Sequence, residues 1–160
     1  MVFHVYLKYF QESADGTYLI AAGIRQPGTS ATTYNGYVVK LDAATGSKIW
    51  EFDFNTNAGT RSGFETVHFT ADGGFIVGGF TDRAGTNFPG FKSGGQIDEG
   101  RPVLHKFSAA LANASSASNN PTPEWSYNCG PANSVCKMED GSIKNMRVYM
   151  DGGKDLRFFV

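Results

Sequence analysis

The sequence is poor in the residues from which most enzyme active sites are built. Its 160 residues include only three histidines, His4, His68 and His105, and two cysteines. None of the histidines has a second histidine at metal-ligand spacing, and the chain contains no HExxH, CxxC, GxSxG or P-loop motif. Since no nucleophile and base can be paired from the sequence, we expect a protein that is not an enzyme. The three histidines are interpreted as ordinary strand or surface residues.

Charge is also scarce, and the two signs are balanced. Charged residues make up 18% of the chain. There are 14 Lys and Arg and 15 Asp and Glu, which gives a net charge of −1. This balance gives no electrostatic support to nucleic-acid binding. No apolar run approaches the length of about 18 residues that a membrane-spanning helix needs. The stretch MVFHVYLKYF alternates apolar and polar residues, which predicts a strand instead of a signal peptide.

Glycine and aromatic residues are abundant in place of charge. The chain has 20 Gly, 13 Phe, 7 Tyr and 2 Trp. This composition is typical of many short strands joined by tight turns. No stretch shows helical spacing for more than a turn. The sequence therefore predicts an all-β protein.

One hairpin pattern occurs three times, in residues 11–24, 68–81 and 148–160. Each copy has an Asp-Gly pair flanked by apolar residues, which is a strong signal for a hairpin turn because both residues tolerate left-handed backbone geometry. The pairs are Asp15-Gly16, Asp72-Gly73 and Asp151-Gly152. The simplest role of these aspartates, and of Asp42 in a later turn, is to cap their own turns; cation binding is the alternative.

The residues that follow the first two hairpins also correspond. Lys40-Leu41 aligns with Lys106-Phe107, and each pair precedes a strand that carries a tryptophan, Trp50 or Trp125. The second copy has a longer connection before this strand, with the low-complexity tract ALANASSASNNPTP. A unit of four antiparallel strands is the composition of a β-propeller blade.

This repeat predicts antiparallel four-stranded blades in a single partial domain over residues 1–160. The expected blades are 1–54, 55–128 and an incomplete 129–160, about two and a half in all. Closed propellers use about four to eight blades. We therefore expect the chain to be part of a larger propeller, completed by further blades of the same polypeptide or by other protein chains.

Two segments resemble known propeller repeats. KLDAATGSKIWEF (40–52) resembles the blade motif of pyrroloquinoline-quinone-type propellers, with Asp42, Thr45, Gly46 and Trp50 on its characteristic positions. Residues 63–91 resemble the bacterial-type β-propeller repeat. The resemblance implies that the tryptophan docks between neighbouring blades, and packing at such a seam is also the simplest role for Trp50 and Trp125, with ligand stacking as the alternative. The second copy departs from the motif, because KFSAAL replaces KLDAAT.

The two cysteines lie close together in NCGPANSVC. A disulfide between Cys129 and Cys136 that closes this Gly/Pro/Asn loop is our preferred interpretation, and it would place the protein in an oxidising compartment. Two unrelated thiols and a metal site are the alternatives.

The loop 81–101 is the most notable polar stretch. Asp82, Asp98 and Glu99 are weak calcium candidates, since carboxylates and backbone carbonyls suit this ion. A solvated loop and a partner-binding loop are the other interpretations. We therefore expect no cofactor and no resident metal beyond this weak calcium candidate.

The tract that lengthens the second copy contains the sequon Asn113-Ala114-Ser115. In an exposed loop it is a candidate for glycosylation of Asn113 in a secreted protein.

Together these features favour a non-enzymatic structural or adhesive propeller, extracellular or on the cell surface, that binds proteins or glycans. One alternative is a fragment of a quinoprotein-type dehydrogenase, which rests on the motif around Trp50. The other is an intracellular scaffold propeller with free cysteines.

Overall fold

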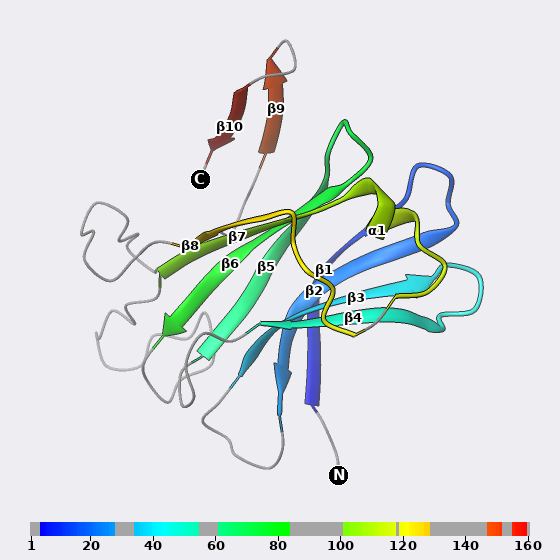
Figure 1. The fold of residues 1–160 in the computed structure, drawn as a ribbon. Coiled ribbons are helices and arrows are strands. Elements are labelled where there is room, and N and C mark those ends of the chain that lie inside the picture. Colours follow the sequence, from blue (N-terminus) through cyan, green and yellow to red (C-terminus); the bar gives the residue numbers. More distant parts are fainter. Residues whose placement is uncertain are drawn as a thin grey trace.

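The structure is a computed structural model that describes seven ranges of the chain. They are residues 4–27, 34–54, 61–83, 101–117, 119–128, 147–151 and 155–159. Strands dominate these ranges, with one short helix, so the fold is all-β as predicted. Figure 1 shows two four-stranded sheets and a separate pair of strands.

The first sheet is an antiparallel meander in which each strand pairs with the next along the chain. Its strands are β1 (His4–Glu12), β2 (Tyr18–Gln26), β3 (Asn35–Asp42) and β4 (Lys48–Phe54). We call it sheet 1.

The second sheet has the same topology and follows directly in sequence. Its strands are β5 (Arg61–Phe69), β6 (Phe75–Arg83), β7 (Arg101–Phe107) and β8 (Trp125–Asn128). We call it sheet 2. The two sheets together confirm antiparallel four-stranded units, and they do not close into a ring within the described residues.

The registers of the two sheets correspond residue by residue. Lys40 pairs with Ile20 and Trp50 in sheet 1, and Lys106 pairs with Ile76 and Trp125 in sheet 2. The sequence alignment of the two lysines and the two tryptophans is therefore confirmed in three dimensions. The repeat is a structural repeat and not only a similarity of composition.

The first strand of each sheet carries the same irregularity. The register of β1 shifts between Leu7 and Tyr9, and that of β5 shifts between Phe64 and Thr66. Each shift leaves one extra residue, Lys8 or Glu65, which is the pattern of a β-bulge. The Lys8 ammonium lies 3.1 Å from a Glu65 carboxylate oxygen, so an ion pair links the two bulges across the sheets.

Side chains opposite one another in adjacent strands share a face, which defines two faces for each sheet. The Trp face carries the tryptophan, and the back face is the other one. In sheet 1 the Trp face includes Ile20, Val38, Lys40, Trp50 and Phe52; in sheet 2 the back face includes Phe64, Val67, Phe75, Val77 and Phe107.

The main hydrophobic core lies between these two faces. It joins Trp50 and Phe52 of the Trp face of sheet 1 to Phe75 and Phe107 of the back face of sheet 2. The sheets therefore stack head to tail, with opposite faces in contact. The back face of sheet 1 and the Trp face of sheet 2 lie outside this core.

The helix α1 (Ala109–Asn113) lies in the connection from β7 to β8. The Ser108 hydroxyl caps it by accepting a hydrogen bond from the Leu111 N–H at 3.1 Å. Ala112 is fully buried in the core, and Leu111 packs against it. The tract was expected to be an exposed loop; instead it begins within a helix, and Leu111 and Ala112 pack into the core, while Asn113, Ser115 and Ser116 are exposed as expected.

The remaining strands, β9 (Arg147–Asp151) and β10 (Asp155–Phe159), form an antiparallel hairpin. A third hairpin was predicted here, and the pairing is present. However, Asp151 ends β9 and pairs with Asp155, whereas Asp72 lies inside its turn. Gly152 lies outside the described residues, so its equivalence to Gly16 and Gly73 stays a prediction.

Candidate functional site

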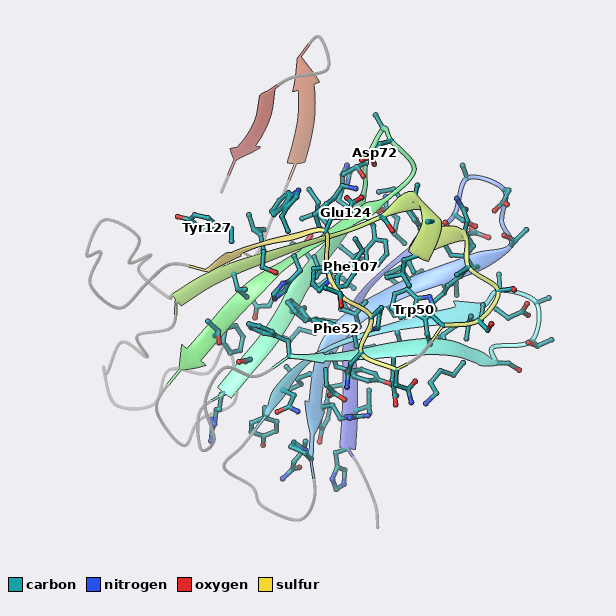
Figure 2. All side chains as sticks on the ribbon, in the orientation of Figure 1. Trp50, Phe52, Asp72, Phe107, Glu124 and Tyr127 are labelled. Carbon is teal, nitrogen blue, oxygen red and sulfur yellow. The ribbon has the colours of Figure 1, made fainter. Side chains whose placement is uncertain are left out.

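The seam between the sheets is the most elaborate site among the described residues. Trp50 is fully buried at its centre, with its ring stacked on Phe75 at 6.0 Å and tilted against Phe107 at 6.5 Å. Figure 2 shows Trp50, Phe52 and Phe107 between the two sheets. A large apolar ring is suited to such a seam, and the structure leaves no exposed Trp50 surface for stacking on a ligand.

Beside Trp50, a histidine is enclosed by phenylalanines. The His105 ring lies 4.3 Å from the Phe54 ring and 5.6 Å from those of Phe52 and Phe64. Its Nδ1 is 2.7 Å from the Ser126 hydroxyl, and its Nε2 is buried without a hydrogen-bond partner. Burial lowers the pKa of His105 to about 4. The expected strand position is confirmed, but only one ring nitrogen has a partner.

A buried lysine connects sheet 1 to the helical connection of sheet 2. Lys40 is 2% exposed, and its ammonium donates to the backbone carbonyls of Ala112 and Ala114, both at 2.7 Å. It also lies 4.0 Å from the centre of the Tyr18 ring. Burial lowers the pKa of Lys40. The carbonyls at the end of α1 thus compensate a cation that the core would otherwise leave unsolvated.

The chain after α1 holds sheet 1 at a second point. The Asn120 N–H donates to the Glu51 carbonyl at 2.8 Å, and the Asp53 N–H donates to the Asn120 side-chain oxygen at 2.8 Å. Asn120 has a φ of 60°, a left-handed conformation that asparagine tolerates better than most residues. The connection therefore bonds to the outer edge of sheet 1 and clamps the two sheets together.

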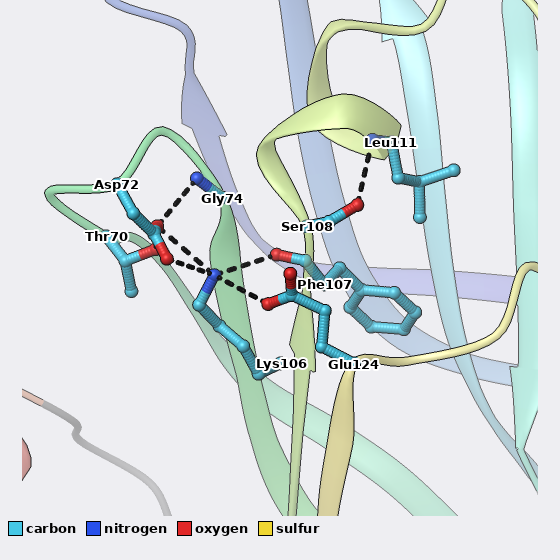
Figure 3. A network of polar contacts seen from close by, with 8 residues as sticks. All are labelled: Thr70, Asp72, Gly74, Lys106, Phe107, Ser108, Leu111 and Glu124. Carbon is cyan, nitrogen blue, oxygen red and sulfur yellow. Dashed lines mark hydrogen bonds and ion pairs between the residues drawn. The ribbon is translucent and has the colours of Figure 1, made fainter.

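The equivalent lysine of sheet 2 has different partners, as Figure 3 shows. The Lys106 ammonium lies 3.0 Å from an Asp72 carboxylate oxygen and 3.4 Å from a Glu124 oxygen, and it donates to the Phe107 carbonyl at 3.0 Å. The Lys106 side chain is 5% exposed, whereas both carboxylates are about half exposed, at 54% and 47%. Lys106 is neutralised within its own sheet.

The Asp-Gly turns are closed by their own side chains. Asp15 accepts hydrogen bonds from the Thr17 N–H at 3.1 Å and from the Ser13 hydroxyl at 2.7 Å. Asp72 accepts from the Gly74 N–H at 3.0 Å and from the Thr70 hydroxyl at 2.5 Å.

These bonds lower the pKa of the turn carboxyls. The Ser13 and Thr17 bonds lower the pKa of Asp15, and the Thr70 bond, with smaller contributions from Gly74 and Lys106, lowers that of Asp72 to about 2. The glycines that follow, Gly16 and Gly73, have φ values of 69° and 83°. Asp15 and Asp72 therefore cap their own turns in the structure.

Asp42 caps the turn between β3 and β4 in the same way. It accepts from the Thr45 N–H and hydroxyl, both at 2.7 Å, and these bonds lower its pKa. Gly46 follows with a φ of 69°. Within the ranges that the structure describes, no three His, Cys, Asp or Glu side chains converge on a metal position.

The second tryptophan is placed differently from the first. Trp125 is 39% exposed on the Trp face of sheet 2, beside Tyr127 at 48%. Trp125 does not lie at the seam between the two described sheets, so its packing between blades stays a prediction. The reason is positional: Trp50 faces sheet 2, whereas Trp125 is on the face directed away from sheet 1.

The back face of sheet 1 combines an apolar part with a polar network. Arg25 forms ion pairs with Asp53 and, at 3.4 Å, with Glu51. Glu51 also contacts the Lys48 ammonium at 3.1 Å and accepts from the Tyr37 hydroxyl at 2.7 Å. The network holds two cations and two anions, so it is electrically neutral.

Several predicted site residues cannot be compared with the structure. Cys129, Cys136, Asp98 and Glu99 lie outside the described residues, and Asp82 is described only as part of β6. The disulfide and the calcium candidate stay predictions. Asn113 is exposed at the last position of α1, and its glycosylation also stays a prediction.

In the described part of the chain, no helix is long and apolar enough to cross a membrane. No protein-family model and no curated protein matches the chain. The resemblance to propeller repeats therefore rests on the sequence motifs. The structure adds two four-stranded sheets with corresponding registers.

Sequence reasoning missed three features of the two sheets. They are the buried lysines at positions 40 and 106, the clamp formed by α1 and Asn120, and the partly satisfied imidazole of His105. The Lys-Leu and Lys-Phe alignment was a usable signal for the lysines, because a cation repeated on an apolar strand face needs fixed partners. The clamp could not be predicted in the same way, because the tract that forms it consists mainly of Ala, Ser and Asn.

Proposed function

We propose that the chain is a non-enzymatic scaffold made of β-propeller blades, which acts outside the cell and presents its connecting loops to proteins or glycans. The observation that carries this proposal is the head-to-tail seam centred on Trp50. Units that bury a core only by stacking on their neighbours form rigid repeat architectures, and these commonly serve as binding surfaces.

The two ends of the strands differ in the length of their connections, which suggests different roles. The short turns after β1, β3 and β5 and the clamp at α1 gather at one end, as Figure 1 shows. The connections that follow β2, β6 and β8 leave from the other end, and they span more residues than the Asp-Gly turns. Loops on a rigid scaffold are where binding residues concentrate. We therefore assign partner binding to the end opposite the Asp-Gly turns.

The extracellular placement is tested by the state of the two cysteines. Mass mapping of the peptide that contains Cys129 and Cys136, with and without reduction, should show a disulfide in protein freshly purified from its source. The exposed Asn113 adds a second readout, since enzymatic deglycosylation should lower the mass. Free thiols together with an unchanged mass would favour the intracellular scaffold instead.

The enzymatic alternative is tested separately. The motif around Trp50 is its sole support, and this residue is fully buried in the seam. Adding pyrroloquinoline quinone, calcium and an alcohol or sugar should give no reduction of a redox dye. Turnover that requires all of these components would replace the scaffold proposal with a quinoprotein dehydrogenase.

A further inference from the structure

Two aromatic side chains on β8 are exposed and have no part in the seam. Trp125 and Tyr127 are 39% and 48% exposed, and they lie on the same face of the last strand of sheet 2. Residues two positions apart on a strand are separated by about 6.6 Å, so the two rings are neighbours. The interior of this face, at Ile76 and Leu104, is buried, so its accessible part is the strip on β8. Figure 2 shows Tyr127 on the side of β8 away from sheet 1.

Two carboxylates border this strip. Glu124 directly precedes Trp125, and its N–H donates to the Lys106 carbonyl at 2.8 Å. Lys106 is the cross-strand neighbour of Trp125. Its ammonium contacts the carboxylates of both Asp72 and Glu124 (Figure 3). The Lys106 side chain is buried, whereas both carboxylates are about half exposed. The lysine therefore fixes the two carboxylates and leaves part of each open to solvent.

The charges of Asp72, Glu124 and Lys106 do not balance. Two carboxylates share one ammonium, which leaves one negative charge beside the aromatic strip. An ionised carboxylate only accepts hydrogen bonds, so the polar atoms that this trio exposes are acceptors. A complementary ligand group is therefore a cation that donates hydrogen bonds and has a flat face for the aromatic rings.

A guanidinium meets these requirements. It carries several N–H donors in one plane, binds carboxylates in a bidentate manner and stacks on aromatic rings. We propose that an arginine side chain of a partner protein binds here, stacked on Trp125 and paired with the exposed carboxylates of Glu124 and Asp72. Tyr127 extends the aromatic surface along the strand. We call these four residues the β8 patch.

Other occupants fit the β8 patch less well. A lysine ammonium is a strongly hydrated point charge without a flat face. A neutral sugar stacks on aromatic rings but leaves the excess negative charge unpaired. An apolar peptide would cover two carboxylates that only one lysine neutralises, which costs free energy. The charge and the exposed rings together therefore favour arginine.

The β8 patch is separate from the connections to which we assign partner binding. It lies near the turn between β5 and β6, which contains Asp72, at the opposite end of the strands. An exposed contact between a cation and an aromatic ring is weak on its own, so we expect the patch to act as one anchor within a larger interface. The inference adds a second contact to the proposed scaffold and names the chemistry of its partner.

The test follows the fluorescence anisotropy of a labelled tetra-arginine peptide during titration with the full chain. Trp125→Ala and Glu124→Gln should each weaken binding by about two- to fivefold, the effect of losing one exposed cation–aromatic contact or ion pair. Trp125→Phe should retain more of the binding than Trp125→Ala, because it keeps an aromatic face. Glu12→Gln removes an exposed carboxylate on β1 and is the matched control for charge, so it should bind as the unmodified chain does.

Two further arms locate the contact and separate it from other chemistry. In a Trp50→Phe chain the peptide should change the fluorescence of Trp125, the remaining tryptophan. Tetra-arginine should bind more tightly than tetralysine, and chitopentaose, a neutral sugar, should not bind. Equal losses in Glu12→Gln and Glu124→Gln, unchanged Trp125 fluorescence, a preference for tetralysine or chitopentaose, or no peptide binding would each overturn the inference. In that case a disulfide in the 129–136 loop and no dye reduction would still leave the scaffold function in place.

Discussion

Acidification should destabilise the protein through His105 before its carboxylates are protonated. The pKa of His105 is lowered by burial from 6.5 to about 4, so the unfolded chain binds a proton at pH 5 and the folded chain does not. The stability that this group contributes is present above pH 6.5 and is lost as the pH falls toward 4. Between pH 7.5 and pH 5 the free energy of unfolding should fall by about 2 kcal/mol from this residue alone.

The assay is reversible urea unfolding at pH 7.5, 6 and 5, followed by circular dichroism. His105→Phe keeps a ring among Phe52, Phe54 and Phe64 but does not titrate, and the exposed Ser126 can bond to water in its place. The variant should lose about 2 kcal/mol of the pH dependence, whereas the exposed His4→Gln control should retain it. An equal pH dependence in the unmodified protein and in His105→Phe would refute the reasoning.

Three further outcomes follow from the same structure. Trp50→Ala should lower the free energy of unfolding by about 3–5 kcal/mol, the usual cost of truncating a buried aromatic residue. Thermal unfolding measures this loss, and a change below about 1 kcal/mol would contradict a central role of Trp50 in the seam. Gly79→Ala should destabilise more than Gly46→Ala, because a Cβ at Gly79 clashes with the Gly63 backbone carbonyl, whereas a Cβ at Gly46 meets no atom and costs only the strain of a φ of 69°. An equal loss in urea unfolding would show that the backbone at Gly79 relaxes. Asp72→Asn should remove part of the acid transition between pH 3.8 and about 2, where this carboxyl takes up its proton; an unchanged transition would argue against its bonds to Thr70 and Gly74.

The local structure of the chain was predictable where one residue type has one physical role. Asp-Gly pairs predicted the turns at Asp15 and Asp72, because these residues supply a side-chain acceptor and a left-handed backbone. The repeated tryptophan likewise predicted a seam at Trp50.

What the sequence did not reveal depends on contacts between distant residues. The burial of Lys40 is tolerable only because carbonyls 72 and 74 residues away reach it, and no local pattern encodes that. Trp125 was expected to resemble Trp50, but a residue's environment depends on which face is covered as well as on its register. The tract around α1 has the composition of a loop, yet Ala112 and Asn120 attach it to sheet 1.

The central claim is that the two sheets stack head to tail through a seam that buries Trp50 and leaves Trp125 outside it. Acrylamide quenching of tryptophan fluorescence tests it directly, because the chain has two tryptophans and each can be observed alone. In Trp50→Phe the signal comes from Trp125, and in Trp125→Phe it comes from Trp50. The account predicts that Trp50, which is fully buried, is shielded from the quencher, whereas Trp125, which is 39% exposed, is quenched much more strongly. A Trp50 that is quenched as readily as Trp125 would contradict it.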